Sequence, residues 1–479
     1  MSARNIFAAV WLLAAPLAAQ RAPVKLPARP DAPPARPFVY PAVTYDSLPN
    51  GLRFAIVENH ELPLVVVQTA VEGAGPLGIS FLDPAGKQGA WGLMLMTLRE
   101  GTSTRSATQI TDEAADLGTE MRFTNSLAFS APAFRSARST WKPSLDLLAD
   151  VLTNPTFPQA SVTRLQNTLA TNIERLPPVS VGPRVLYANL YGAESPDNQF
   201  ATPTSVRSLT RDDLVAMQQK YLRPQNTMLV ISGDVTVPEA RAALARAFGG
   251  WQRGGTTVTP TVPAAPTPAP TTIYLKDNPG ATQSLVVSGI VLPGRENVNA
   301  AAVEALSSVL GDFSVSSGSR MYSAFRLERG LSYSPRVELA TRPVPETAPL
   351  VATLQVPVGV TDTAIATLMR VYRELRQDKP ATASELEFAK RNLIGRLPAD
   401  MERVDLLASS VLLNMRDHLP PDYLNKWIGR INSLTLPEVQ AAAAKYLDPD
   451  HMVIAVVGDR SKIEAALRAT GIPVVIVEK

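Results

Sequence analysis

The apolar positions of the chain follow both strand and helix spacings. Leu64–Val71 and Ser284–Ile290 are nearly continuous apolar runs, a pattern typical of buried strands. Ile110 and Leu117 lie at helical spacing behind Ser106, a residue type that favours helix starts. Further helices are expected at Leu145–Leu152, Ala301–Leu310, Thr363–Leu375 and Ser384–Leu397. The pattern predicts sheets combined with helices.

One block of sequence occurs twice, at an offset of 225 residues. Ten of the 27 positions from Ser208 to Asp234 are identical to those from Ser433 to Asp459. Each copy predicts an amphipathic helix that ends at Lys-Tyr-Leu before a proline, then a buried strand, then a Gly-Asp turn into another helix. The two strands are expected at Met228–Ile231 and Met452–Val457. We therefore predict a duplicated α+β fold.

The first twenty residues have the pattern of a signal peptide. Arg4 gives a positive start, Ile6–Ala15 is apolar, and Leu17–Ala19 ends in the small residues that a signal peptidase accepts. The alternative, an amphipathic first helix of the fold, would need a polar face that this segment lacks. The apolar run is too short to span a bilayer, and no other stretch approaches 18 consecutive apolar residues. We expect export to a bacterial periplasm, without membrane insertion after signal cleavage.

A linker separates the two copies. Thr256–Thr272 contains five prolines and no charged residue, a composition typical of linkers. The predicted organisation is a signal peptide (1–20), a proline-rich arm (21–42), an N-terminal domain (43–252), a Pro/Thr-rich linker (253–271) and a C-terminal domain (272–479).

Composition narrows the chemistry that the chain can perform. The 46 Lys and Arg residues nearly balance 43 Asp and Glu residues, so we expect no nucleic-acid partner. Cysteine is absent, which excludes disulfides, thiolate metal sites and cysteine nucleophiles. The histidines are His60, His418 and His451, and they lie too far apart in sequence for one helix to present two imidazoles to zinc.

Three further motifs point to one known family. Leu48–Arg53 (LPNGLR) precedes an apolar strand, and Glu100–Thr102 (EGT) follows a helix. The third motif runs from Arg320–Tyr322 (RMY) through Arg326–Ser334 (RLERGLSYS). In this order and spacing they resemble the pitrilysin-type zinc peptidases, in the branch of the mitochondrial processing peptidase. The resemblance covers about 43–479 and implies two homologous domains around peptide substrates. Each would be a mainly antiparallel sheet covered by helices, and the linker would join them into a clamshell.

The zinc motif of that family is missing from this chain. The resemblance places its H-x-x-E-H motif on the helix before Glu100–Thr102, with the two His positions on Gly92 and Met96 and the Glu position on Leu95. These side chains can neither bind zinc nor take a proton from metal-bound water. Even if Glu174 aligned with the family's downstream ligand, one carboxylate would not hold the metal. We expect no cofactor in this chain.

The family's second motif is retained. Arg326 and Tyr333 match the arginine and tyrosine that, as the resemblance implies, hold the peptide backbone and stabilise the oxyanion opposite the zinc. A guanidinium and a phenol suit that role because both direct hydrogen bonds toward developing negative charge. By composition alone, a surface ion pair beside Glu328 and a half-buried aromatic ring would be the alternative.

A serine-rich loop stands where the family has a glycine-rich loop implicated in substrate capture. Its backbone donors could hold a peptide, although an ordinary connection between helices would explain the loop equally well. The candidate substrate-binding residues are Gly311, Ser316, Ser317, Gly318 and Ser319.

Two hypotheses about function follow. In the first, the chain is the non-zinc subunit of a heterodimeric periplasmic metalloendopeptidase, and Arg326 and Tyr333 act in trans while a homologous partner subunit carries the zinc. In the second, the chain is a catalytically inactive pseudoenzyme that binds peptides or scaffolds an envelope complex. A serine hydrolase is a third and poorly supported possibility, because none of the histidines lies in a recognisable nucleophile motif.

Overall fold

The computed structural model describes residues 38–74, 82–125, 130–192, 199–259, 267, 269–311, 318–340 and 347–478. The predicted signal peptide, most of the proline-rich arm and much of the linker lie outside these ranges. The predicted domain boundaries therefore stay predictions. Within the described ranges, no helix combines the length and the apolarity needed to cross a bilayer.

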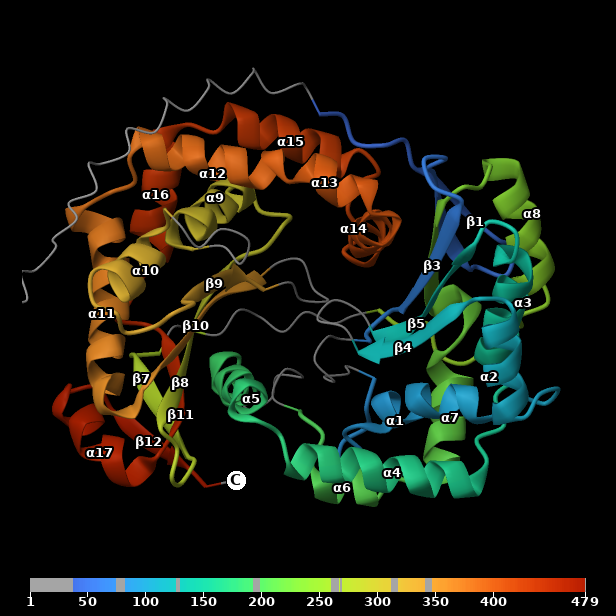
Figure 1. Ribbon diagram of the computed structural model, residues 1–479, viewed down its shortest axis with the longest axis horizontal. Coiled ribbons are helices and arrows are strands. Elements are labelled where there is room, and N and C mark those ends of the chain that lie inside the picture. Colours follow the sequence, from blue (N-terminus) through green and yellow to red (C-terminus); the bar gives the residue numbers. More distant parts are fainter. Residues whose placement is uncertain are drawn as a thin grey trace, which may run out of the picture. The chain divides into compact units, whose positions relative to one another are not determined.

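The first sheet has six strands in the order β1-β2-β6-β3-β5-β4 (Figure 1). They are β1 (Thr44–Ser47), β2 (Arg53–Glu58), β3 (Leu64–Val71), β4 (Glu120–Asn125), β5 (Ser130–Ala137) and β6 (Thr227–Gly233). All neighbouring strands are antiparallel except β2 and β6. Every residue of β6 is buried, which explains why this central strand is an almost continuous apolar run.

The second sheet has six strands in the order β12-β7-β11-β8-β10-β9. They are β7 (Thr272–Asp277), β8 (Gln283–Pro293), β9 (Arg336–Leu339), β10 (Thr347–Pro357), β11 (Val453–Gly458) and β12 (Val474–Val477). Its two parallel pairs are β7 with β11 and β7 with β12, and the others are antiparallel.

The two sheets repeat each other strand by strand. Five strands of the second sheet, β7, β11, β8, β10 and β9, follow the order of β2, β6, β3, β5 and β4 in the first. The predicted α+β duplication with mainly antiparallel sheets is therefore confirmed. The sixth strands differ: β1 precedes the first sheet's repeated core, whereas β12 follows the last helix of the second half. The sequence pattern did not predict β12.

Helices surround each sheet. In the first half they are α1 (Ala90–Thr97), η1 (Leu98–Glu100), α2 (Ala107–Asp116), α3 (Trp141–Thr153), α4 (Gln159–Glu174), α5 (Pro178–Leu190), α6 (Pro203–Arg207), α7 (Arg211–Tyr221), η3 (Pro224–Asn226) and α8 (Val237–Phe248). In the second half they are α9 (Ala300–Leu310), α10 (Arg320–Tyr322), η4 (Ser323–Leu327), η5 (Val358–Val360), α11 (Thr361–Arg373), η6 (Glu374–Asp378), α12 (Ala383–Gly395), α13 (Leu397–Glu402), α14 (Val404–Arg416), α15 (Tyr423–Ser433), α16 (Leu436–Tyr446) and α17 (Arg460–Ala469).

The repeated sequence motifs mark the starts and ends of the expected helices in both halves. α7 and α16 each begin behind a threonine, Thr210 and Thr435, that forms a capping box, and each ends at the tyrosine of Lys-Tyr-Leu. Ser106 also forms a capping box at the start of α2. The Gly-Asp turn requires glycine for a steric reason. A Cβ atom on Gly233 would lie only 2.1 Å from the Leu64 carbonyl oxygen.

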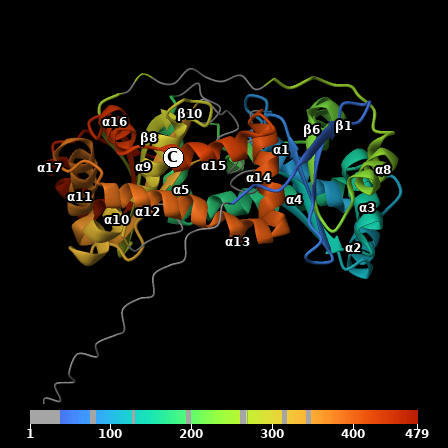
Figure 2. The same ribbon diagram turned by 90° about the horizontal axis from the view of Figure 1, so that it is seen from above.

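Each half contributes one helix to the sheet of the other. α14, from the second half, buries Leu407 and Val411 against Val66 and Val230 of the first sheet (Figure 1). Figure 2 shows the same helix beside β1 and β6 from a second direction. α5, from the first half, packs on β8, where a Cβ atom on Gly182 would lie 2.7 Å from the Leu285 side chain. These exchanged helices join the halves through apolar packing.

α14 ends at a cluster of ion pairs that also involves the first sheet. Glu72 directly follows β3 and is only 4% exposed. Its carboxylate forms ion pairs with Arg53 and with Nε2 of His418, the latter at 3.3 Å. Asp417, next to His418, is buried and lies 3.0 Å from Nη1 of Arg295 in the second half. The cluster therefore links both halves by charge.

This cluster predicts a pH-dependent effect of His418→Gln on the free energy of unfolding. The hydrogen bond to Glu72 raises the pKa of His418, so the protonated form stabilises the folded state. That contribution is complete below the unfolded pKa of 6.5 and is lost as the pH rises through the folded pKa. In urea unfolding, the wild-type protein should be more stable than the variant by about 0.5 kcal/mol near pH 5 and by little near pH 9. An equal difference at both pH values would contradict the pairing.

Candidate functional site

Arg326 lies in a short helical segment of unusual geometry. η4 is a π-helix, in which Glu328 N donates to the Ser323 carbonyl oxygen at 2.9 Å. Such wide turns occur frequently at functional sites. Phe325 is fully buried beneath the segment, and its carbonyl oxygen accepts a hydrogen bond from Leu331 N at 2.7 Å. The buried anchor and the returning backbone fix the position of η4 in the second half.

Arg326 and Tyr333 lie in direct contact. The Cζ atom of Arg326 lies 4.0 Å from the centre of the Tyr333 ring, and Nη1 donates to the Tyr333 carbonyl oxygen at 3.2 Å. Tyr333 is 76% exposed, whereas Arg326 is half-buried. The structure thus brings these two predicted residues together at a position open to solvent. Their catalytic role stays a prediction.

The guanidinium of Arg326 forms no ion pair with any carboxylate in the part of the chain that the structure describes. Nearby arginines differ: Arg320 lies 2.7 Å from Glu385, and Arg370 lies 2.9 Å from Glu374. Those two positive charges are neutralised inside the protein. Arg326 is held by an aromatic ring and a carbonyl, so its charge can act on an incoming acceptor group.

Tyr322 is a third residue at this site; it belongs to the second-domain motif that begins at Arg320, but no role was predicted for it from the sequence. The Cζ atom of Arg326 lies 5.1 Å from the centre of the half-buried Tyr322 ring. Residues four apart on a helical segment share a face, and this spacing is the signal that could have revealed the contact.

The serine-rich loop is described only at its two ends. Gly311 and Gly318 have φ values of 148° and 106°, which favour glycine. Ser319 is buried, and its side chain accepts a hydrogen bond from Tyr322 N at 3.3 Å, so it caps α10. Ser316 and Ser317 lie outside the described residues. The substrate-binding role of the loop stays a prediction.

The positions that match the zinc motif lie on α1, in an apolar setting. Leu95 is 3% exposed, and Met96 packs against the core of the first half one turn beyond Gly92. Glu174, at the end of α4, has its carboxylate 2.7 Å from the guanidinium of Arg207. None of the three α1 residues offers an oxygen or nitrogen side-chain ligand.

The histidines are dispersed over the fold as well. His60 Nδ1 lies 2.6 Å from Asp234, and His451 Nδ1 lies 2.8 Å from Asp448. Among the residues with described positions, no group of three or more His, Asp or Glu side chains could hold a metal ion. Zinc in proteins requires three or four such ligands in tetrahedral geometry. The described residues therefore do not fit the zinc of the family.

This misfit predicts that the isolated chain does not retain zinc. After dialysis against zinc and then against metal-free buffer, elemental analysis should find no stoichiometric metal. Glu174→Gln should give the same result, because Glu174 is paired with Arg207 and faces no further ligand set. Retention of one zinc per chain that is lost in Glu174→Gln would contradict the assignment.

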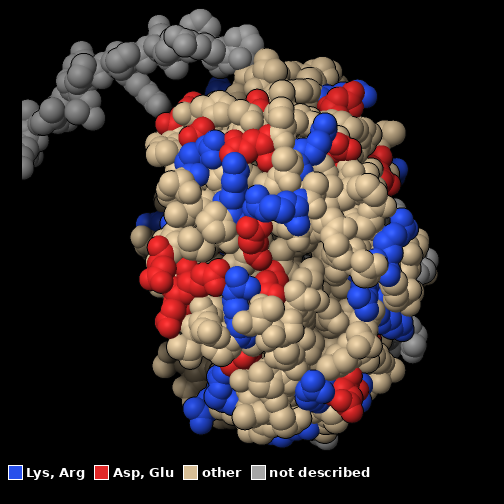
Figure 3. All heavy atoms as spheres, turned by 90° about the vertical axis from the view of Figure 1, so that its right-hand side faces the viewer, with Lys and Arg blue, Asp and Glu red and all other residues tan. Residues whose placement is uncertain are grey.

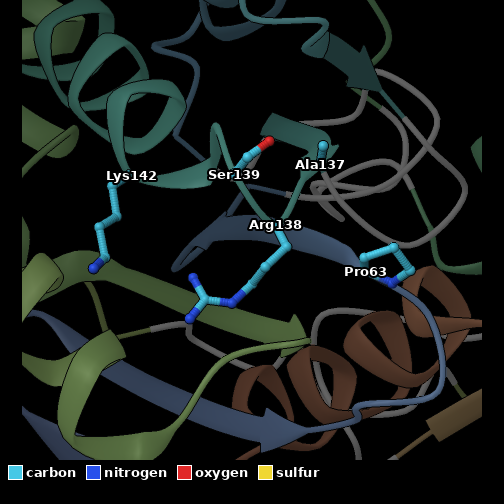
Figure 4. Close-up of a pocket in the computed structure, with 5 residues that line it drawn as sticks. All are labelled: Pro63, Ala137, Arg138, Ser139 and Lys142. Atoms are coloured by element: carbon cyan, nitrogen blue, oxygen red, sulfur yellow. The ribbon is translucent and has the colours of Figure 1, made fainter.

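A cavity of about 540 Å³ lies elsewhere in the first half. It is lined by Pro63, Ala137, Arg138, Ser139 and Lys142 (Figure 4). Glu239 neutralises both cations, lying 2.7 Å from Arg138 and 2.8 Å from Lys142. On the face shown in Figure 3, basic and acidic side chains are interspersed. Neither this cavity nor this face is the predominantly basic surface that nucleic-acid binding requires.

Comparisons with known proteins give one family match and several structures of the same fold. Residues 208–393 match the family described as the Peptidase M16 inactive domain. No curated protein sequence matches the chain. The structure of a peptidase M16 inactive domain from Pseudomonas fluorescens is 24% identical, with a TM-score of 0.75 over 87% of this chain and 98% of that chain.

Two further solved structures share the fold at lower identity. A protease from Helicobacter pylori is 16% identical, with a TM-score of 0.75 over 87% of this chain and 99% of that one. The periplasmic protease PqqL from Escherichia coli is also 16% identical, with a TM-score of 0.69 over 89% of this chain and 48% of its own length.

The family match covers the end of the first half and most of the second half, including the candidate site. The matched residues include Arg326 and Tyr333 and exclude the zinc-motif positions Gly92, Leu95 and Met96. Residues 208–393 therefore match the Peptidase M16 inactive domain, and the chain shares the fold of the solved M16 structures.

Proposed function

We propose that the chain is the non-zinc subunit of a periplasmic heterodimeric metalloendopeptidase. Arg326 and Tyr333 would position a peptide and stabilise the oxyanion, in trans to a homologous subunit that carries the zinc. The observation that carries the proposal is the Arg326–Tyr333 contact: an exposed phenol and a guanidinium without an ion-pair partner among the described residues, in a chain whose α1 offers no zinc ligand.

The chemistry of the residues supports oxyanion stabilisation by this chain and metal binding by its partner. A peptide carbonyl that is being attacked develops negative charge on its oxygen, and fixed donors aimed at that oxygen lower the barrier. A guanidinium keeps its charge at every physiological pH and offers a planar set of N–H donors. A phenol adds one directional O–H donor. The partner would supply the metal and the base, because α1 of this chain has no side chain that could provide either. The signal-peptide pattern supports a periplasmic location. The Escherichia coli protein PqqL, which shares the fold, is itself described as a periplasmic protease.

Purification of the protein from its native source tests the proposal. We expect an equimolar complex with a homologous chain that carries H-x-x-E-H, and we expect one zinc per heterodimer, located in that partner. Purification of a monomer or a homodimer without zinc would contradict the proposed heterodimer.

The second candidate is a pseudoenzyme that binds peptides or scaffolds an envelope complex. It is favoured by one observation, the description of the matched family as an inactive domain. A zinc-bearing complex that cleaves no peptide, yet binds peptides in an Arg326-dependent manner, would support this candidate over the first.

A further inference from the structure

We propose that Tyr322 is a positioning residue that holds the guanidinium of Arg326 in its working orientation. The proposal rests on the function proposed above, and it assigns a role to a residue of the second-domain motif that had none. It starts from the second ring contact of Arg326, whose Cζ atom lies 5.1 Å from the centre of the Tyr322 ring and 4.0 Å from that of Tyr333.

The two rings differ in how firmly the fold holds them. Tyr333 is 76% exposed. Tyr322 is half-buried at the end of α10, where its backbone N–H donates to the cap residue Ser319. Met321, directly before it, is fully buried in the second core. Tyr322 is therefore the ring with fixed position, whereas the Tyr333 ring has more freedom to move toward a ligand.

The wide turn of η4 brings Arg326 toward the Tyr322 ring. The two residues are four apart, and the π-helix begins directly after Tyr322, at Ser323. A ring within about 6 Å of a guanidinium attracts the cation through its negative face. That contact restrains the long arginine side chain without neutralising it, since a phenol ring carries no charge. An acidic partner would also restrain the arginine, but it would remove the positive charge that the oxyanion requires.

The contact requires the ring of Tyr322 and does not require its hydroxyl. Tyr322→Phe should therefore behave as the wild-type protein, whereas Tyr322→Leu should release Arg326. Tyr322→Met is a second variant without an aromatic ring, whose flexible side chain can fill an irregular gap, in case the leucine variant folds poorly. Equal thermal unfolding of all three variants and the wild-type protein would establish that only the local contact has changed.

Chemical modification of the arginine by phenylglyoxal tests the contact in the isolated chain, without any partner or substrate. Mass spectrometry would follow the modification rate at Arg326, with the exposed Arg329 as an internal reference. Loss of a cation–π contact of ordinary strength should raise the Arg326 rate about 3-fold in Tyr322→Leu and Tyr322→Met. The rate in Tyr322→Phe should stay at the wild-type value.

Peptide cleavage by the reconstituted complex gives the second measurement. Tyr322→Leu should lower kcat about 3-fold with little change in KM, and phenylalanine should restore it. An unchanged Arg326 modification rate in both Tyr322→Leu and Tyr322→Met would overturn the proposal. So would an increased rate in Tyr322→Phe. If the modification rates respond as expected while the complex cleaves no peptide, the positioning contact stands and the proposed endopeptidase function fails.

Discussion

Replacing Arg326 by alanine is expected to lower kcat/KM of the reconstituted peptidase about 100-fold, because removal of one preorganised oxyanion donor typically has an effect of this size. Arg326 forms no ion pair within the described chain, so its charge is not needed to balance a neighbouring carboxylate. The variant should therefore fold and assemble normally. Steady-state cleavage of a fluorogenic peptide measures the effect, and gel filtration confirms assembly.

Two further variants separate the role of Arg326 from general effects. Arg329→Ala removes an exposed cation three residues away and should leave kcat/KM nearly unchanged. Tyr333→Phe keeps the ring beside Arg326 and removes only the phenol donor, so a loss of about 10-fold is expected. Full activity of the assembled complex with both Arg326→Ala and Tyr333→Phe would refute the catalytic role of this pair.

Leu407→Ala, in the exchanged helix α14, is expected to lower the free energy of unfolding by about 3 kcal/mol. Leu407 is fully buried between α14 and the first sheet, in the same cluster as Val66 and Met228. Truncation removes apolar contacts and leaves a cavity that the packed sheet cannot fill. Urea unfolding measures the change.

The matched control for this variant is Leu327→Ala. Leu327 is 68% exposed, so its truncation should change the free energy of unfolding by less than about 0.5 kcal/mol. If the two leucine variants were equally stable, α14 would not hold the halves together as the structure indicates.

The fold was predictable where local patterns decide the structure. The strands at Leu64–Val71 and Ser284–Ile290 form β3 and most of β8, because continuous apolar runs are buried on both faces of a sheet. Capping residues and prolines fixed the ends of α7 and α16. The exchange of α5 and α14 between the halves could not be predicted, since it depends on packing between segments more than 100 residues apart in sequence. The terminal strand β12 was missed as well.

The candidate site was likewise predictable only in part. The expected loss of zinc ligands at Gly92, Leu95 and Met96 rests on residue type alone and stays a prediction. The contact of Arg326 with Tyr333 was expected only from a motif, and its geometry depends on the π-helix of η4, which periodicity does not indicate. Tyr322 lies in the second-domain motif, but its contact with Arg326 was not predicted, because a lone tyrosine four residues before an arginine is more often simple packing.

Cleavage of a peptide library by this chain, by its zinc-bearing homologue and by their equimolar mixture tests the central claim most directly. The account predicts that neither chain alone cleaves the library efficiently, that the mixture does, and that chelation of zinc abolishes the activity. If the homologue alone were as active as the mixture, or if the mixture were inactive with zinc bound, this chain would not complete a divided active site.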